Sequence, residues 1–284
     1  MNRASAPVVR VAAPVVRQPV VRQAAVRLAI QVAAIVAALA AWQLWTGAAK
    51  DPYFPEPSSI VSALHHQWFT GPASHLWLNR DGTGNLLPSL SRMLGGWAVA
   101  SLIGIVAGVA IGRLPVLADL TEPIVHFARA VPPAILVPVF LVMFPVGTPV
   151  ELATIVFGVL WPVLLNSIDG ARHVDRGHIE SARAFRVPAY QRLTRIILPS
   201  AAPKIFAGLR VALALALTMM IISEFVGSTN GIGQEENTAW TTFDVPVIWA
   251  VILLLGLLGI VFNAVFSLLE RRVLAWQHGV RSAA

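Results

Sequence analysis

The sequence of 284 residues contains no cysteine and few charged residues. The absence of cysteine excludes a disulfide framework, a thiolate nucleophile and a metal site with cysteine ligands. Only 12% of the residues are charged, whereas soluble domains usually carry about a quarter. Hydrophobic residues make up 56% of the chain, and its mean hydropathy is +0.71. This composition predicts an integral membrane protein.

Motifs for nucleotide hydrolysis and for common hydrolases are also missing. Neither of the two lysines, Lys50 and Lys204, follows a glycine directly, so the G-x-x-x-x-G-K-[S/T] phosphate loop is absent. The sequence has no H-E-x-x-H or G-x-S-x-G pattern, and only His65 and His66 are adjacent histidines. We therefore expect no enzymatic activity, no metal site and no cofactor in this chain.

Long apolar stretches dominate the sequence. A membrane-spanning helix needs about 20 mostly apolar residues, because every backbone polar group must be satisfied internally. Six stretches qualify and predict an all-α polytopic membrane protein with six transmembrane helices: 28–45, 93–112, 123–146, 152–168, 205–223 and 245–269. They define one domain over 28–269, between an arginine-rich arm, 1–27, and a tail, 270–284. The first stretch also resembles a signal peptide, but its length favours an anchor.

Two of the predicted spans have distinctive features. Gly104, Gly108 and Gly112 recur every four residues in the second span, on a helix face that another backbone can approach closely. The third span is interrupted by four prolines: Pro132, Pro133, Pro138 and Pro145. Irregular backbone at membrane depth is tolerated only inside protein or beside water, so this span is expected to line a path. A simple kinked helix is the alternative.

The distribution of basic residues predicts the orientation of the chain. Sixteen lysines and arginines lie in one set of alternate connections and two in the other, not counting Arg92, Arg129 and Arg210 at or within span ends. The positive-inside rule then places both termini and the loop 170–204 in the cytoplasm. This explanation of the net charge of +7 is preferred to nucleic-acid binding.

The loop 170–204 contains the segment "ESARAFRVPAYQRLTRIILPSAAP". Arg176, Glu180 and Arg183 form one charged helical face. A second face is small or apolar and consists of Ile179, Ala182 and Phe185. Pro188 disfavours helix at the residue before it and suits the start of a new helix. The loop therefore predicts a helix, a sharp turn and a second helix that ends near 198–199.

This segment resembles the cytoplasmic "EAA" loop of permease subunits of ATP-binding-cassette importers, E-A-A-x-x-x-G followed nine residues later by I-x-L-P. The matching residues are Glu180-Ser181-Ala182 and Ile196-Ile197-Leu198-Pro199. The resemblance covers most of 55–276 and is greatest to the nitrate, taurine and aliphatic-sulfonate permease group. It includes "FPEPSSIVSAL", "LLPSLSRMLGGWAVASLIGIVAG", "PPAILVPVFLV", "LPSAAPKIFAGLRVALALA" and "SEFVGSTNGIG". It implies the type I importer permease fold.

The resemblance also implies partners and a location. It implies a cytoplasmic ATPase subunit, an extracytoplasmic solute-binding protein and a second permease copy, most simply in a homodimer, in the bacterial inner membrane. The expected solute is a small oxyanion such as a sulfonate, taurine or nitrate. Permeases of the same family for a pyrimidine, a flavin or an aromatic acid are the alternative. A secondary transporter without an ATPase is the alternative of another class.

The expected ATPase-contact residues follow from the same resemblance, whereas the expected path residues follow from the broken third span and from polar groups at membrane depth. The expected ATPase contact comprises Glu180, Ser181, Ala182, Arg183, Phe185 and Arg186. The expected solute path comprises Pro133, Asn166, Met219, Met220, Ser223 and Glu224. For Glu224 a plain helix-terminal carboxylate is an equal alternative, and methionines are more often packing residues. Arg186 occupies the motif's glycine position, and we expect Pro188 to break the helix in its place. Gly231 and Gly233 predict a tight turn in an outer loop.

Overall fold

The computed structural model describes residues 20–75 and 77–276. These residues form helices and turns, with no β-strand among them. The chain divides into two compact units, residues 1–58 and residues 59–284. Residues 1–19 of the predicted arm and residues 277–284 of the predicted tail lie outside the described residues.

The first unit contains one long helix, α1 (Val20–Ala49). It begins before the predicted span start at Leu28, and its apolar part, Val26–Ala49, is long enough to cross a membrane. The segment after α1 is tied back to it by Gln43. The Gln43 Nε2 atom donates to Glu56 Oε2 at 2.6 Å, and the Ser58 backbone N–H donates to Gln43 Oε1 at 3.1 Å.

The second unit contains the remaining predicted spans. Its long helices are α3 (Leu87–Arg113), α6 (Thr148–Arg172), α9 (Leu198–Gly227) and α11 (Val245–Val273), and shorter helices are α2 (Pro57–Trp68) and α10 (Ile232–Thr242). With α1, the described residues hold five helices long and apolar enough to span a membrane, or six if one bent pair forms a single span. This agrees with the six spans predicted from the sequence.

The bent pair consists of α4 (Pro115–Ala130) and α5 (Pro133–Met143), which meet at 97°. Between them, Val131 and Pro132 have extended backbone, with ψ of 119° and 125°. A residue before a proline is pushed out of the helical region, and Val131 and Pro132 both precede one. The predicted break in the third span is confirmed, and it is a sharp corner rather than a gentle kink.

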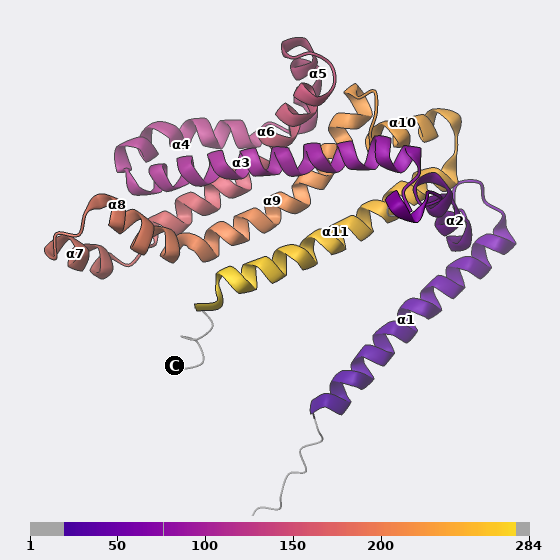
Figure 1. The fold of residues 1–284 in the computed structure, drawn as a ribbon, viewed down its shortest axis with the longest axis horizontal. Coiled ribbons are helices and arrows are strands. Elements are labelled where there is room, and N and C mark those ends of the chain that lie inside the picture. Colours follow the sequence, from indigo (N-terminus) through magenta and orange to yellow (C-terminus); the bar gives the residue numbers. More distant parts are fainter. Residues whose placement is uncertain (1–19, 76, 277–284) are drawn as a thin grey trace, which may run out of the picture. The chain divides into compact units, whose positions relative to one another are not determined.

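Glycines set the packing of α3 on α6, which lie side by side in Figure 1. A Cβ atom at Gly104 would lie 2.9 Å from Val163 Cβ, and one at Gly108 would lie 2.5 Å from Ser167 Cβ. At Gly112 it would lie 2.6 Å from the Ile168 carbonyl oxygen. Larger residues cannot fit without moving one helix, so the predicted glycine face is confirmed as a close helix contact.

Two π-helical turns precede prolines near helix starts. The first, Gly82–Leu86, leads into α3 and Pro88, and the second, Leu193–Ile197, leads into α9 and Pro199. A proline has no N–H, and its ring clashes with the carbonyl four residues earlier. In both cases that carbonyl lies within the π turn, where the wider backbone accommodates the ring. The helical path therefore continues through each proline.

Candidate functional site

The predicted ATPase-contact helix is α7 (Arg176–Ala184). Its start is capped by Asp175, whose Oδ1 accepts the His178 backbone N–H at 3.2 Å. Ile179 and Ala182 are buried, and Ile179 belongs to the main hydrophobic core. The apolar face predicted for these two residues is confirmed, and it fixes α7 to the rest of the unit.

The exposed side of α7 carries most of the predicted contact residues. Glu180, Ser181 and Arg183 are exposed, as is Arg186 beyond the helix end. Phe185, which the sequence placed on the apolar face, is instead 84% exposed, because the helix ends there and the chain turns away from the core. In the described part of the chain no ion pair joins Glu180 to an arginine.

Arg186 makes the turn after α7 in a left-handed conformation, with φ of 54°. Its N–H donates to the Arg183 carbonyl at 2.9 Å, and the Val187 N–H donates to the Ala182 carbonyl at 2.9 Å. This pair of bonds is the Schellman motif, in which glycine usually occupies the left-handed position. The expectation that Pro188 substitutes for the glycine's turn was therefore wrong. Pro188 is the N-cap of the next helix, α8 (Ala189–Arg192).

The second helix of the loop does not end near Leu198 and Pro199, as the sequence predicted. Helical structure runs from Ala189 to Gly227, through the π turn that accommodates Pro199, and passes into α9. Only the short turn at 185–188 therefore separates α7 from the helical stretch that contains the spanning helix α9.

The predicted path residues fall in separate places. Pro133 and Met219 both approach Gly158 on α6, where a Cβ atom would lie 3.3 Å from Pro133 Cγ and 2.6 Å from Met219 Sδ. Asn166 is half-buried, and its Nδ2 donates to the Pro162 carbonyl at 2.8 Å. The structure thus brings Pro133 and Met219 together and leaves Asn166 further along α6.

The other three predicted path residues lie in the packed interior of the chain. Met220, Ser223 and Glu224 are at most 1% exposed, and the Ser223 hydroxyl donates to the Met220 carbonyl at 2.9 Å. In this structure these three side chains are covered by other residues and offer no surface to a solute. Glu224 has a further set of partners that sequence reasoning did not identify.

Glu224 belongs to a buried ionic cluster with Arg92 and Glu151. Arg92 Nη1 lies 3.2 Å from Glu224 Oε1, and Arg92 Nε lies 2.7 Å from Glu151 Oε2. The Nε hydrogen is directed at Thr148 Oγ1, 3.3 Å away, so the contact with Glu151 is an ion pair without a hydrogen bond. One guanidinium thus joins α3, α6 and α9 at the same end of the bundle.

The cluster also fixes the turn before α10. Arg92 Nη1 donates to the Asn230 carbonyl at 3.2 Å, and the Gly233 N–H donates to Glu224 Oε2 at 3.1 Å. Gly231 has φ of 124°, and a Cβ atom there would lie 2.4 Å from Glu224 Oε2. Only glycine fits this position, so the predicted tight turn is confirmed. The turn packs directly against the Glu224 carboxylate.

A second buried carboxylate, Glu235, holds α10 against neighbouring elements. Its Oε2 accepts the Trp68 indole N–H at 2.6 Å, and its Oε1 accepts from Asn85 Nδ2. Asn85 Oδ1 in turn accepts the Gly231 N–H at 3.0 Å. Burial raises the pKa of the Glu235 carboxyl, while the hydrogen bonds from Asn85 and Trp68 oppose that rise.

Sequence reasoning missed the roles of Arg92 and Glu151. Arg92 was set aside as a residue at a span end, and Glu151 was not singled out. An available signal was that ionisable residues inside membrane-embedded apolar stretches are rare and pair with one another. The pairing itself could not be read from the sequence, because it depends on the relative placement of three helices.

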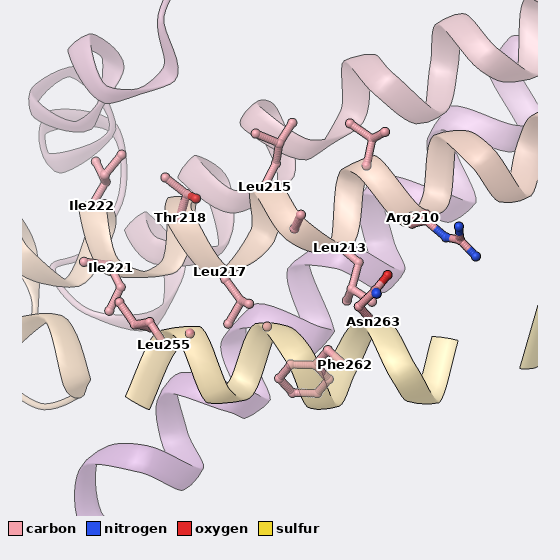
Figure 2. Close-up of a pocket in the computed structure, with 14 residues that line it drawn as sticks. Arg210, Leu213, Leu215, Leu217, Thr218, Ile221, Ile222, Leu255, Phe262 and Asn263 are labelled. Carbon is pink, nitrogen blue, oxygen red and sulfur yellow. The ribbon is translucent and has the colours of Figure 1, made fainter. Parts of the chain in front are cut away.

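A groove of about 790 Å³ lies between α9 and α11. Figure 2 shows Leu217 and Ile221 of α9 beside Leu255 and Phe262 of α11 along this groove. Its one charged lining residue, Arg210, forms an ion pair with Glu270 on α11. The groove therefore offers little to a charged ligand.

The chain is similar to several transport proteins. It is 28% identical over 251 residues to the bicarbonate transport system permease protein CmpB of Synechococcus elongatus, covering 86% of this chain and 89% of that protein. It is 27% identical over 256 residues to the taurine transport system permease protein TauC of Escherichia coli, covering 88% and 90%. It is 26% identical over 242 residues to a putative aliphatic sulfonates transport permease protein, SsuC, of Bacillus subtilis, covering 84% of each.

The fold has a counterpart among solved structures. An inward-facing structure of the MetNI methionine ABC transporter contains a chain that superposes with a TM-score of 0.60 at 19% identity, over 66% of this chain and 94% of that one. At that identity the likeness concerns the fold, which is that of a type I importer permease. Residues 100–275 match the family of binding-protein-dependent transport system inner membrane components. The chain belongs to this family and is a permease subunit of an ATP-binding-cassette importer.

Proposed function

We propose that this permease carries a small oxyanion, as one half of a homodimeric path that is driven by a separate ATPase. The solute class is supported by the relatives named for bicarbonate, taurine and aliphatic sulfonates. Bicarbonate and sulfonates share a compact anionic head of oxygen acceptors. A path for such solutes requires donors and positive charge at membrane depth.

The observation that carries the coupling role is the construction of α7. Its Glu180, Ser181 and Arg183 side chains are exposed, while Ile179 anchors the helix in the core. The left-handed turn at Arg186 leads into a helical stretch that continues through α9. A cytoplasmic ATPase that binds this exposed side, with Arg186 and Phe185 at its edge and Ala182 beneath it, would act directly on α9.

The remaining assignments complete the proposal. The solute path runs beside the α4–α5 corner and α9, with Pro133, Asn166 and Met219 nearest to it and Met220, Ser223 and Glu224 supporting it from behind. Both termini lie in the cytoplasm, in keeping with the basic residues of the alternate connections. A solute-binding protein delivers the solute at the other side, near α10.

The solute class is tested by reconstituting the permease with its ATPase and its solute-binding protein in lipid nanodiscs. Bicarbonate, taurine, methanesulfonate and nitrate are compared with uracil, riboflavin and benzoate for stimulation of ATP hydrolysis. We expect stimulation by at least one member of the first set and none by the second. Stimulation by uracil or riboflavin alone would remove the oxyanion assignment.

The coupling role is tested separately with Glu180→Lys. This substitution reverses a charge at the centre of the exposed side of α7 and should abolish co-purification of the ATPase. Asp81→Lys is the matched control, because it reverses an exposed carboxylate outside the loop 170–204. Unchanged ATPase co-purification and transport in Glu180→Lys would show that the exposed side of α7 is not the ATPase contact.

A further inference from the structure

The helix α4 carries a stripe of ionisable side chains that the assignments above leave unused. Glu122, His126 and Arg129 recur at four- and three-residue spacing, and all three are exposed. His126 Nε2 lies 3.6 Å from Glu122 Oε1, and His126 Nδ1 lies 3.1 Å from Arg129 Nη2. The three side chains thus form a connected row along one face of the helix.

A different face of α4 is exposed and apolar. Its side chains are between 66% and 75% exposed and belong to Val116, Leu120, Ile124 and Phe127. These positions also recur at helical spacing, roughly opposite the ionisable row. The helix therefore presents a face suited to lipid or to an apolar protein surface, and a second face that is suited to neither.

Contacts with α3 and α6 give the depth of the ionisable row. Ala118 packs in a buried cluster with Ile111 of α3 and Leu164 of α6, so α4 lies alongside these spans. At its far end, beyond the corner, Pro133 packs against Gly158. Gly158 is ten residues after the start of α6, which is about 15 Å along the helix axis.

Arg129 lies in the last turn of α4, directly before the corner, and Pro133 lies directly after it. Arg129 therefore lies near the middle of a hydrocarbon layer that is about 30 Å thick. A charged side chain facing lipid at that depth costs at least about 2.5 kcal/mol, and such residues normally face a water-filled cavity or protein. The ionisable row therefore faces away from lipid.

Arg129 also differs in its partners from Arg92 and Arg210, the two other arginines that lie at or within the ends of the predicted spans. Arg92 is bound to Glu151 and Glu224, and Arg210 is bound to Glu270. Among the described residues, the side-chain partner of Arg129 is His126 alone, which leaves most of its N–H donors free. A guanidinium with free donors matches two oxygens of one carbonate, nitrate or sulfonate group.

We propose that the ionisable row of α4 faces the solute path and that Arg129 binds the oxyanion during its passage. This inference rests on the proposed function and names the residue that recognises the solute in the membrane. His126 orients the guanidinium from one side. Glu122 lies on the same row, seven residues before Arg129, and its negative charge weakens the attraction of the row for the oxyanion. Weak binding of this kind allows the solute to leave the site again.

The absence of cysteine from the chain permits a direct test in the assembled transporter. His126→Cys places a thiol on the ionisable row, and Ile124→Cys places a matched thiol on the apolar face. Anionic and cationic methanethiosulfonate reagents are added from either side, with and without ATP. We expect the first thiol to react and the second to stay unreactive. The proposal would be overturned if the thiol at position 126 did not react. It would also be overturned if the reagents reached this thiol from the same single side both with and without ATP.

The role of Arg129 is tested by adding Arg129→Gln to His126→Cys. Arg129→Gln should lower the ratio of the anionic reagent's rate to the cationic reagent's rate about tenfold, because it removes the positive charge beside position 126 and leaves the negative charge of Glu122. A ratio that Arg129→Gln leaves unchanged would refute anion recognition by this residue. Arg80→Gln serves as the control for loss of an exposed arginine, since Arg80 lies outside α4 and outside the loop 170–204.

These outcomes separate the inference from the proposed function. If the solute screen identifies an oxyanion, Arg129→Gln should raise its KM at least tenfold, and Arg129→Lys should raise it less. If Arg129→Gln transports the oxyanion as well as the wild type does, the role proposed for Arg129 is wrong, but the proposed solute class is unaffected. A screen in which only uncharged solutes are active defeats the solute class, while the thiol labelling still decides whether the row faces the path.

Discussion

The guanidinium of Arg92 lies 3.2 Å from Oε1 of Glu224 and joins two helices at residues 132 positions apart in the sequence. Glu151 adds a second carboxyl group to the same arginine, so the buried cluster contains more acid than base. Breaking a buried pair leaves an uncompensated charge, which destabilises a protein far more than the loss of a surface pair. The Arg92 cluster is therefore expected to determine the stability of this end of the bundle.

Arg92→Leu should lower the free energy of unfolding by about 3–5 kcal/mol, because Glu224 and Glu151 would remain buried without their cation. The measurement is the temperature at which half of the detergent-solubilised protein is lost from its size-exclusion peak. Arg176→Leu is the control, since Arg176 is exposed and makes no ion pair in the described part of the chain.

The double variant Arg92→Leu/Glu224→Leu provides a second check on the cluster. Removing both partners should be less damaging than the sum of the two single losses, because the second substitution removes the stranded charge. Strict additivity of the two losses would show that the ion pair contributes nothing.

Gly108→Ala tests the close contact between α3 and α6. The new methyl group would lie 2.5 Å from Ser167 Cβ and 2.7 Å from the Leu164 carbonyl oxygen, so one helix must move. Overpacking of this kind typically costs about 1–3 kcal/mol. Gly256→Ala is the matched control, since its methyl group would meet nothing within 4 Å. Equal thermal stability of the two variants would contradict the contact.

Arg186→Gly tests the strained turn after α7. A left-handed conformation costs a non-glycine residue roughly 1 kcal/mol, which glycine avoids. The greater freedom of glycine in the unfolded chain offsets part of that gain. We expect a small rise in thermal stability together with weaker ATPase binding, because the guanidinium lies in the proposed contact. Lower stability would show that Arg186 makes a stabilising contact that compensates for its backbone strain.

The sequence was sufficient for features that depend on local pattern. The spans follow from apolar length, the α4–α5 corner from its prolines, and the α3–α6 contact from glycines at four-residue spacing. Features that depend on tertiary placement were missed. The partners of Arg92 come from helices far apart in sequence, and the conformation of Arg186 is set by the Schellman bonds of its own helix end. Phe185 was misplaced because helical periodicity was continued past the residue where the helix stops.

The last prediction concerns the pH dependence of stability at α10. The pKa of the Glu235 carboxyl is raised from its ordinary value of 4.5 by burial, so the folded protein holds this proton more tightly than the unfolded chain does. The contribution of Glu235 to stability is therefore greatest below pH 4.5 and is lost as the pH rises through the raised pKa.

Glu235→Gln should remove this component of the pH dependence. It should also leave Trp68 or Asn85 without a good acceptor, because a glutamine side chain has one acceptor oxygen where the ionised carboxylate has two. Thermal unfolding between pH 4 and pH 8 measures both effects, and Glu180→Gln is the exposed control. The difference in unfolding temperature between the wild type and Glu235→Gln should be largest at low pH. A difference that grows toward high pH would mean that the hydrogen bonds to the ionised carboxylate outweigh the effect of its burial.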